Sequence, residues 1–545
     1  MLWEAGLDSE KAKELRRLVT ETIRVEGGQL VQVDFVDPKG VVDVATSRRN
    51  QVIMGRRGTG KSLLLRHVAR RLPKGTQVAY VDCEELKHHT LPNVLIDILD
   101  VVFRELLSRS RWAWVPGTAH WRLNRTIKAA RAALHRLRTK DDQVLADIKH
   151  SSMSSVTGTK SAELGATYSI FGGKYGASKS TQNQTQTEAT YKIRWSKISG
   201  LNDEFTILKQ DLEEAIRLRP GTDTVFIQLD DFYHLRPTDQ PFVIDFIHRL
   251  CKNLPCFFKV ATLPHASALY LSVDGQPVGV QKLHDYQVIN VDYSLEEFGT
   301  TRDQIEKIFF NVARIAEVAE DDVRTFFRGG GFDRLIIAGG GVPRDCLAIL
   351  AELLQNATVD SAFSVGKDDV RKISPQILSS RIDDLKRDSA VAIQDDLLRA
   401  IYALREVALN QKRANVFVVD LQHLREGGEL EFLVQKLIDY RIIHLISTNL
   451  THKSVEGTFN AYAIDIGFYA HMRKLAQRLT ETDITANNAK EKYRSAPRLT
   501  SDDLVPLVKS APDDLIDAIL VEEEDEDPES PGSARRLVPP VKVSA

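Results

Sequence analysis

The fold is decided by one stretch of the chain, Gln51-Val52-Ile53-Met54-Gly55-Arg56-Arg57-Gly58-Thr59-Gly60-Lys61-Ser62. Its first four residues are mostly apolar and predict a short buried strand, whereas the leucines that follow it are spaced as in a helix. Three glycines between strand and helix let backbone N–H groups converge, and a helix N-terminus adds about half a positive charge. The stretch therefore predicts a loop that binds phosphate at the end of a buried strand.

The same stretch matches the P-loop signature, Gly-x4-Gly-Lys-Ser, in the strand-to-helix setting that the signature requires. Lys61 is expected to reach the β and γ phosphates, and the Ser62 hydroxyl is expected to ligate Mg2+. The alternative is a chance Gly/Lys/Ser turn. The residues predicted to bind the nucleotide are Gly55, Arg56, Arg57, Gly58, Thr59, Gly60, Lys61, Ser62 and Leu63.

An acidic pair, Asp230-Asp231, follows the apolar run 225–229. The carboxyl ends of parallel strands face the crevice where such sheets bind ligands. Phosphoryl transfer needs a carboxylate near the metal and a group that orients the attacking water. We predict that Asp230 belongs to the Mg2+ shell and that Asp231 polarises the water. The alternative is a pair that caps the following turn.

Strands and helices alternate on both sides of these motifs. Apolar strands are expected at 77–82 and 256–262, and helices at 92–107, 203–218 and 242–252. This alternation favours an α/β fold with a parallel sheet flanked by helices. Beyond residue 295 the pattern is mainly helical. From 393 to 466 it reads as helix, strand, two helices and a hairpin, which is a winged-helix pattern.

The alternation breaks between residues 108 and 199, which we interpret as an insertion. Its first half is basic, and three tryptophans lie among the cations. Arginines neutralise phosphates and tryptophans stack on unpaired bases, so this half is a candidate DNA-binding surface. The alternative is a solvated amphipathic helix whose apolar stripe is Ile127, Ala130, Leu134 and Leu137. The cations are Arg109, Arg111, Arg122, Arg125, Lys128, Arg131, Arg136, Arg138 and Lys140, and the tryptophans are Trp112, Trp114 and Trp121.

Two further segments are polar. Residues 151–190 are rich in Ser, Thr, Gly, Gln and Asn, which predicts a mobile loop or a flat hairpin. The tail from Ala486 carries the acidic run 522–527 and is predicted to be disordered.

Composition narrows the class of protein. The 545 residues predict two to four domains. The formal net charge of −2 excludes a uniformly basic DNA-coating protein and an acidic solvating one. It hides a cancellation between the basic insertion and the acidic tail. The four cysteines are scattered along the chain, which predicts buried, reduced thiols. The sequence shows neither a signal peptide nor an apolar run long enough to span a membrane, so we expect a cytoplasmic protein.

With these motifs in this order, the chain resembles AAA+ ATPases, and most closely the bacterial members similar to the origin-recognition (replication initiator) branch. The resemblance covers residues 45–470 without the insertion, and it implies ATP and Mg2+ as ligands. It implies that Thr262 is the sensor 1 residue. It also implies that the sensor 2 motif is Gly341-Val342-Pro343-Arg344, in which Arg344 reaches the γ phosphate from a helical lid. Taken alone, Arg344 would be a surface arginine of a helix.

The expected fold is thus an α/β P-loop NTPase sheet with a helical lid and a C-terminal winged-helix-like domain. The predicted catalytic residues are Lys61, Asp231, Thr262 and Arg344, and the predicted metal ligands are Ser62 and Asp230. The expected segments are an N-terminal segment (1–45), an ATPase core (46–270) containing the insertion 108–199, a lid (271–387), a winged-helix-like domain (388–473) and a polar, acidic, disordered tail (474–545).

The chain departs from the family pattern at three places. Asp230-Asp231 replaces the usual Asp-Glu, which predicts slow turnover and resembles STAND-like and KAP-like nucleotide switches. The arginine-finger segment 279–285 has no arginine, and Lys282 is its only obvious cation. The candidate DNA-reading helix at 430–440 carries Glu431 and Asp439 against Lys436, so phosphate repulsion favours a role in protein contacts or lid support. The wing, with His452 and Lys453, could still touch a DNA backbone.

Three functions remain open. The first is an ATP-binding and ATP-hydrolysing AAA+ protein that acts on DNA, through residues 109–140, or on a DNA-bound complex. The second is a STAND-like nucleotide-gated switch in bacterial defence or signalling, with slow turnover. The third is an adaptor whose insertion and acidic tail recruit proteins. A protein partner or a homo-oligomer is compatible with each, and no membrane is expected.

Overall fold

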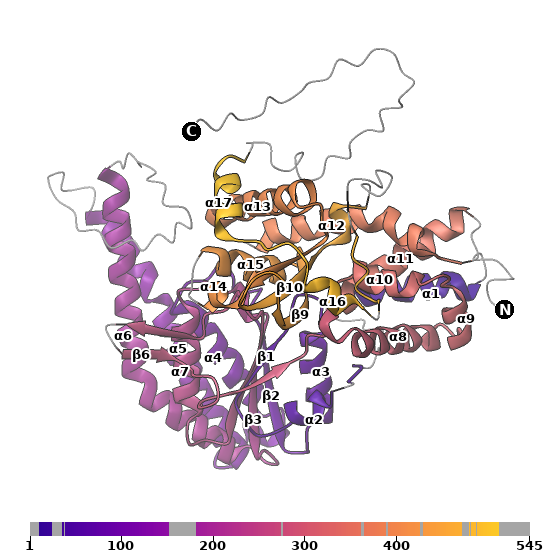
Figure 1. Ribbon diagram of the computed structural model, residues 1–545. Helices are drawn as coiled ribbons and strands as arrows, with labels where there is room; N and C mark the ends of the chain where they lie inside the picture. Colours follow the sequence, from indigo (N-terminus) through magenta and orange to yellow (C-terminus); the bar gives the residue numbers. More distant parts are fainter. Residues whose placement is uncertain are drawn as a thin grey trace.

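The computed structural model describes residues 10–23, 35–37, 39–151, 181–273, 276–360, 364–388, 391–425, 429–470, 479, 481–486 and 488–511. A parallel sheet lies at the bottom of Figure 1, with a small C-terminal sheet above it and a group of helices to the right. Among the described residues, no helix combines the length and the apolar composition that crossing a membrane requires.

The large sheet has five parallel strands in the order β2-β3-β4-β1-β7. All seven residues of β3 are buried, because helices cover both faces of the sheet. This is the predicted α/β P-loop NTPase fold. The strands are β1 (Gln51–Met54), β2 (Thr76–Asp82), β3 (Thr224–Asp230), β4 (Cys256–Thr262) and β7 (Gln287–Asn290), and the adjoining helices are α2 (Val41–Ala45), α3 (Lys61–Arg71), α4 (Asn93–Leu106) and α7 (Gln240–Cys251).

The register of these strands positions the site. Met54, the last residue of β1, pairs with Thr262 on one side and with Asn290 on the other. Asp82 at the end of β2 pairs with Asp230 at the end of β3. Since all five strands are parallel, the loop that begins at Gly55 emerges on the same edge as these residues. The short antiparallel hairpin of β5 (Tyr270–Val273) and β6 (Gln276–Gly279) follows β4.

The insertion is a pair of long helices, α5 (Ala119–Ser151) and α6 (Thr181–Leu218), which pack on each other and on α4. Ile127 and Leu134 of the predicted apolar stripe are buried in the same core as the sheet. The predicted loop or hairpin is wrong for 181–190, which form the first turns of α6. Extending a helix from its packed half costs less than starting one, so the polar composition does not prevent it. Residues 152–180 lie outside the described residues.

The helical group packs into one hydrophobic core with the C-terminal unit. The N-terminal helix α1 (Glu10–Ile23) belongs to this core, because it packs against α8 and α11. The helices of the group are α8 (Phe298–Ile315), α9 (Glu320–Thr325), α10 (Gly331–Ala338), α11 (Pro343–Asp360) and α12 (Lys367–Asp388).

The C-terminal unit has the predicted order of helix, strand, two helices and hairpin. Its three strands form an antiparallel sheet in the order β8-β10-β9. A π-helical turn at Glu406–Gln411 extends the first helix. The elements are α13 (Val391–Arg405), β8 (Val416–Asp420), α14 (Leu421–Arg425), α15 (Glu429–Asp439), β9 (Ile443–Thr451) and β10 (Thr458–Ile464).

The structure differs from the predicted disordered tail at residues 488–511. These residues form α16 (Ala489–Tyr493) and α17 (Ser501–Lys509), and α17 packs on α13. The reason is a small set of apolar side chains spread through a polar segment. Tyr493, Leu504 and Val508 are each 3% exposed or less. The acidic run 522–527 lies outside the described residues.

Candidate nucleotide-binding site

The loop between β1 and α3 curls around the helix N-terminus. Gly58 and Gly60 have φ angles of 86° and 91°, a left-handed conformation that favours glycine. A Cβ atom at Gly58 would also lie 2.7 Å from the Cβ of Arg344, so no side chain fits there. The glycines therefore permit both the turn and the close approach of a lid helix.

Lys61 lies inside this loop and is 5% exposed. Its Nζ donates to the carbonyl oxygens of Gly55 (2.9 Å) and Arg56 (3.1 Å). Burial lowers the pKa of Lys61, although the charges of Asp231 and Asp230 act to raise it. The ammonium group is thus held where the loop and the two carboxylates meet.

Asp230 is 2% exposed and is held by hydrogen bonds on both carboxylate oxygens. Tyr80 Oη donates to Oδ2 (2.7 Å), and the backbone N of Asp231 donates to Oδ1 (3.0 Å). Burial and the Asp231 charge raise the pKa of Asp230 to about 6, while hydrogen bonds from Tyr80 and Ser62 act in the opposite direction. The two predicted metal ligands, Ser62 and Asp230, are therefore in contact, and both offer the oxygen atoms that Mg2+ takes.

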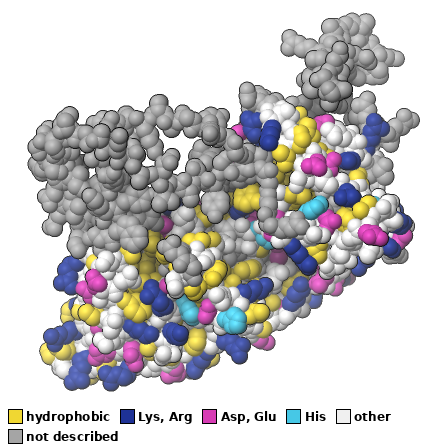
Figure 2. Space-filling view, turned by 60° about the vertical axis from the view of Figure 1, so that its left-hand side comes forward, with side chains coloured by type: hydrophobic (Ala, Val, Ile, Leu, Met, Phe, Trp, Pro, Cys, Tyr) yellow, Lys and Arg dark blue, Asp and Glu magenta, His cyan; other side chains and the backbone are white. Residues whose placement is uncertain are grey.

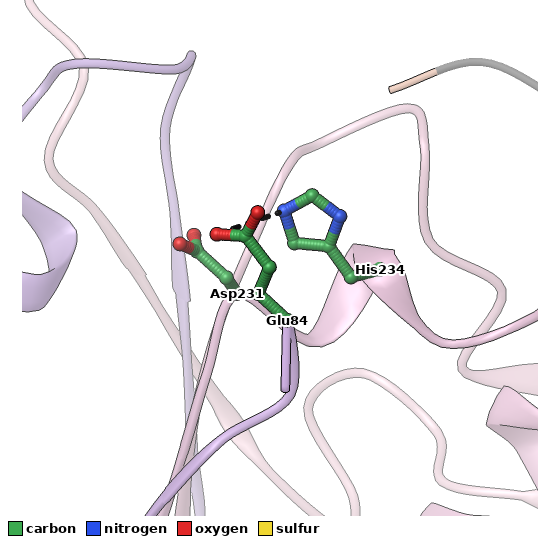
Figure 3. A group of neighbouring side chains, drawn as sticks. All are labelled: Glu84, Asp231 and His234. Atoms are coloured by element: carbon green, nitrogen blue, oxygen red, sulfur yellow. Dashed lines mark ion pairs between the residues drawn. The ribbon is translucent and has the colours of Figure 1, made fainter. Parts of the chain in front are cut away.

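Asp231 is the centre of a group that the sequence did not reveal. Asp231, Glu84 and His234 place one ligand atom each within 4.8 Å of one another, and Figure 3 shows the Glu84 carboxylate between the Asp231 carboxylate and the His234 ring. Burial lowers the pKa of His234 below its usual value. Glu84 lies two residues beyond β2, and β2 neighbours β3. This strand order is the signal that could have paired Glu84 with Asp231.

The two predicted sensors lie on the same edge of the sheet. Thr262 is fully buried beside Met54, and its Oγ1 shares a hydrogen bond with Ser267. The backbone N of Arg344 donates to the Gly58 carbonyl (3.3 Å). Burial lowers the pKa of Arg344, and the nearby Arg441 charge adds to that effect. Arg344 is therefore a half-buried arginine that lies against the P-loop.

Arg56 is among the residues predicted to bind the nucleotide, but its side chain contacts other parts of the protein. Its guanidinium forms a two-bond ion pair with Asp292, at 2.7 and 2.9 Å, just beyond β7. It also donates to the carbonyls of Tyr293 (3.2 Å) and Gly340 (3.0 Å). Since Arg56 faces β7 and the lid, its contribution to a phosphate site is confined to its backbone.

A buried chain of polar contacts continues from Arg56 into the C-terminal sheet. Arg56 Nη1 lies 3.4 Å from His444 Nδ1, and His444 Nε2 lies 3.2 Å from Asp465 Oδ2. Asp465 pairs in turn with Arg381 of α12. Burial lowers the pKa of His444. The P-loop is thereby linked to β9, to the end of β10 and to the lid.

The chain of contacts returns to the P-loop through the lid. Arg381 lies 2.8 Å from Asp345, and Arg441 bridges Asp345 (2.6 Å) and Asp384 (3.0 Å). Asp384 lies 3.9 Å from Arg57 of the P-loop. The local sequence does not indicate these partners, because each pair joins segments that are far apart in the chain.

The candidate DNA-reading helix, α15, is packed against the large-sheet domain. Asp439 Oδ2 accepts a hydrogen bond from the backbone N of His265 (3.2 Å), and Lys436 Nζ donates to the His265 carbonyl (3.1 Å). His265 follows β4, three residues after Thr262. The C-terminal turn of α15 therefore contacts the segment that carries the predicted sensor 1.

No family model and no curated protein matches the chain. Solved structures do. The Aeropyrum pernix ORC2 protein is 11% identical, with a TM-score of 0.38, over 91% of this chain and 98% of that one. Drosophila ORC bound to DNA is 12% identical, with a TM-score of 0.33, over 85% and 91%. The Walker-type ATPase of Pyrococcus abyssi is 13% identical, with a TM-score of 0.35, over 82% and 99%. The α/β P-loop NTPase fold follows from the chain's own parallel sheet and from the loop between β1 and α3, and its structural neighbours include ORC proteins.

Proposed function

We propose that the protein binds ATP with Mg2+ and hydrolyses it slowly. The observation that supports this most strongly is the meeting of Lys61, Ser62, Asp230 and Asp231 at one edge of the sheet, covered by Arg344. Each of these residue types matches a task in phosphoryl transfer. The lysine and the loop amides would hold the phosphates, and Ser62 with Asp230 would hold Mg2+.

Bound Mg2+ would supply positive charge beside the phosphates. The residues of the chain would do the rest. Lys61 would exchange its two bonds to loop carbonyls for bonds to phosphate oxygens. Asp231 would orient the attacking water, and Arg344 would contact the γ phosphate from the lid. Thr262, whose hydroxyl is shared with Ser267, would sense the γ phosphate from the end of β4.

Slow turnover follows from the surroundings of Asp231. Asp is one methylene shorter than Glu, and the Asp231 carboxylate lies in a group with Glu84 and His234. Both features hinder the orientation of a water molecule. D231N should remove hydrolysis and leave ATP binding within about threefold of the wild type. If D231N hydrolyses ATP at the wild-type rate, Asp231 does not have the proposed role.

A second candidate is a nucleotide-gated switch in which occupancy matters more than turnover. The observation that favours it is the buried chain of contacts from Arg56 and Arg57 through the lid to His444 and Asp465. A ligand that displaces Arg57, or that shifts the loop backbone carrying Arg56, would disturb this chain. Protease digestion with and without ATP tests the idea, because a switch should change its cleavage pattern on binding, before hydrolysis. An unchanged pattern at saturating ATP would exclude it.

Part of the basic insertion is suited to single-stranded DNA. Trp114 is 81% exposed and Trp112 is 51% exposed. Lys128 lies 5.6 Å from the Trp114 ring centroid, and Arg111 lies 5.6 Å from that of Trp112. Exposed aromatic rings beside cations are the elements of a base-stacking surface.

Other cations of the insertion are engaged within the protein. Arg131 lies 2.7 Å from Asp100, and Arg138 lies 2.5 Å from Asp97 of α4. On the face shown in Figure 2, Lys and Arg side chains are spread among hydrophobic and acidic ones. We therefore propose a narrow site around the two tryptophans. The W112A/W114A variant should weaken binding of a single-stranded oligonucleotide by tenfold or more, at about 1–3 kcal/mol per stacked base. R138A is the matched control, and equal binding by both variants would refute the site.

A further inference from the structure

Two carboxylates and one imidazole converge beside the proposed ATP site without any described role for the imidazole. Glu84 follows β2, Asp231 follows β3, and His234 ends the short 3-10 turn Phe232–His234. Their ligand atoms lie within 4.8 Å of one another, and Figure 3 shows the two carboxylates and the ring side by side, with the Glu84 carboxylate in the middle. Within the part of the chain that the structure describes, this is the only such group of His, Cys, Asp and Glu side chains.

His234 is the unusual member of the group. Its side chain is 7% exposed, and its Nε2 atom is buried without a hydrogen-bond partner among the described residues. The nearest carboxylate oxygen, Glu84 Oε2, is 4.0 Å from Nε2, which is too far for a hydrogen bond. The ring lies 4.3 Å, centroid to centroid, from that of Tyr233. A buried polar atom without a partner destabilises the folded state, so this nitrogen is expected to have a ligand.

The donor set indicates which ligand. Imidazole nitrogen suits Zn2+, Cu2+ and Ni2+, and a mixed nitrogen and oxygen site also takes Mn2+, although more weakly, whereas Mg2+ prefers sites made of oxygen atoms alone. A cation between the three side chains would accept the Nε2 lone pair and balance two negative charges. Ser62 and Asp230, by contrast, offer only oxygen atoms. The two neighbouring sites would therefore differ in the metal that they select.

We propose that Glu84, Asp231 and His234 form a binding site for a divalent transition-metal ion, separate from the Mg2+ ligands Ser62 and Asp230. Metal binding at this site requires no nucleotide, so this proposal can be tested independently of ATP hydrolysis. An ion bound there would also hold Asp231, and hence the metal content of the protein would influence its ATPase rate.

The test is a titration of the full chain, stripped of metal by a chelator, with Mn2+ alone and no nucleotide. Loss of the free Mn2+ electron paramagnetic resonance signal measures binding. H234A should weaken Mn2+ binding by tenfold or more, since loss of a group that merely orients a metal ligand already costs about 10–100-fold. E84Q should do the same, and because Glu84 is exposed, this variant should not disturb folding. Excess Mg2+ should compete poorly.

Two control variants separate this site from others. H248A removes a histidine that faces one carboxylate, Asp285, at 3.7 Å, and it should bind Mn2+ like the wild type. S62A should also retain binding. Circular dichroism of each variant checks folding. The proposal is wrong if the wild type does not bind Mn2+, or if S62A loses the ion while H234A and E84Q keep it.

Discussion

The substitution Arg56→Met tests whether the second residue of the P-loop stabilises the fold by holding the loop against Asp292, Tyr293 and Gly340. The substitution removes the two-bond ion pair with Asp292 and two hydrogen bonds to the carbonyls of Tyr293 and Gly340. Asp292 would remain with 16% of its side chain exposed and without its main partner. Removing one partner of a buried pair costs about 3–5 kcal/mol. We expect a loss of about 4 kcal/mol in the free energy of unfolding, measured by urea denaturation followed by circular dichroism.

A double-mutant cycle with Asp292→Asn isolates the ion pair. Burial alone would raise the pKa of Asp292, yet the Arg56 charge and hydrogen bonds hold it below its usual value, so the two residues are strongly coupled. D292N alone should lower the free energy of unfolding by about 3 kcal/mol. If the two losses were additive, R56M/D292N would lose about 7 kcal/mol, but we expect it to lose about 4 kcal/mol. The difference of about 3 kcal/mol is the coupling energy of the ion pair. Arg70→Met, on the exposed side of α3, is the matched control and should be nearly neutral. If the two single losses add to within about 0.5 kcal/mol, Arg56 does not act through Asp292.

Two predictions concern pH. Asp230 has a pKa of about 6, so about 90% of its carboxyl groups are ionised at pH 7 and about 10% at pH 5. Because only the ionised form is expected to hold Mg2+, the Mg2+-dependent affinity for ATP, measured by calorimetry, should fall about tenfold from pH 7 to pH 5. D230N should lack that step, and the same fall in D230N would assign it to another group. Burial raises the pKa of Asp439 to about 7, so its ionised form destabilises the fold above pH 7, and this cost disappears as the pH falls toward 4. In urea denaturation, D439N should therefore be more stable than the wild type at pH 8, by at most about 4 kcal/mol, and the two proteins should be nearly equally stable at pH 4. The same difference in stability at both pH values would contradict this assignment.

The sequence predicted the parts of the fold and site that depend on local patterns. The P-loop glycines and the acidic pair after the run 225–229 each lie beside a short apolar strand, so their positions at the sheet edge follow from strand direction. The apolar spacing of Ile127 and Leu134 indicated an amphipathic helix as the alternative to a DNA-binding surface, and both residues are buried in α5.

The parts that were missed depend on partners distant in the chain. Glu84 and His234 meet only because β2 and β3 are neighbours. Arg381 and Asp465, both 2% exposed or less, form an ion pair across 84 residues, and nothing in either local sequence marks the residue as buried. α17 was missed because Leu504 and Val508 are too few to offset the polar composition around them. In each case tertiary packing decides, and local propensity does not.

Calorimetric titration of the full chain with ATP and Mg2+, in the wild type and in Lys61→Ala, tests the central claim most directly. The ammonium group of Lys61 is buried between the loop carbonyls and the two carboxylates, where a phosphate would take its hydrogen bonds. Hydrogen bonds to charged groups contribute about 1.5–3 kcal/mol, so K61A should weaken ATP binding by about tenfold or more. Equal ATP affinity in the two proteins, or no binding by the wild type, would contradict the claim that this loop is a nucleotide site.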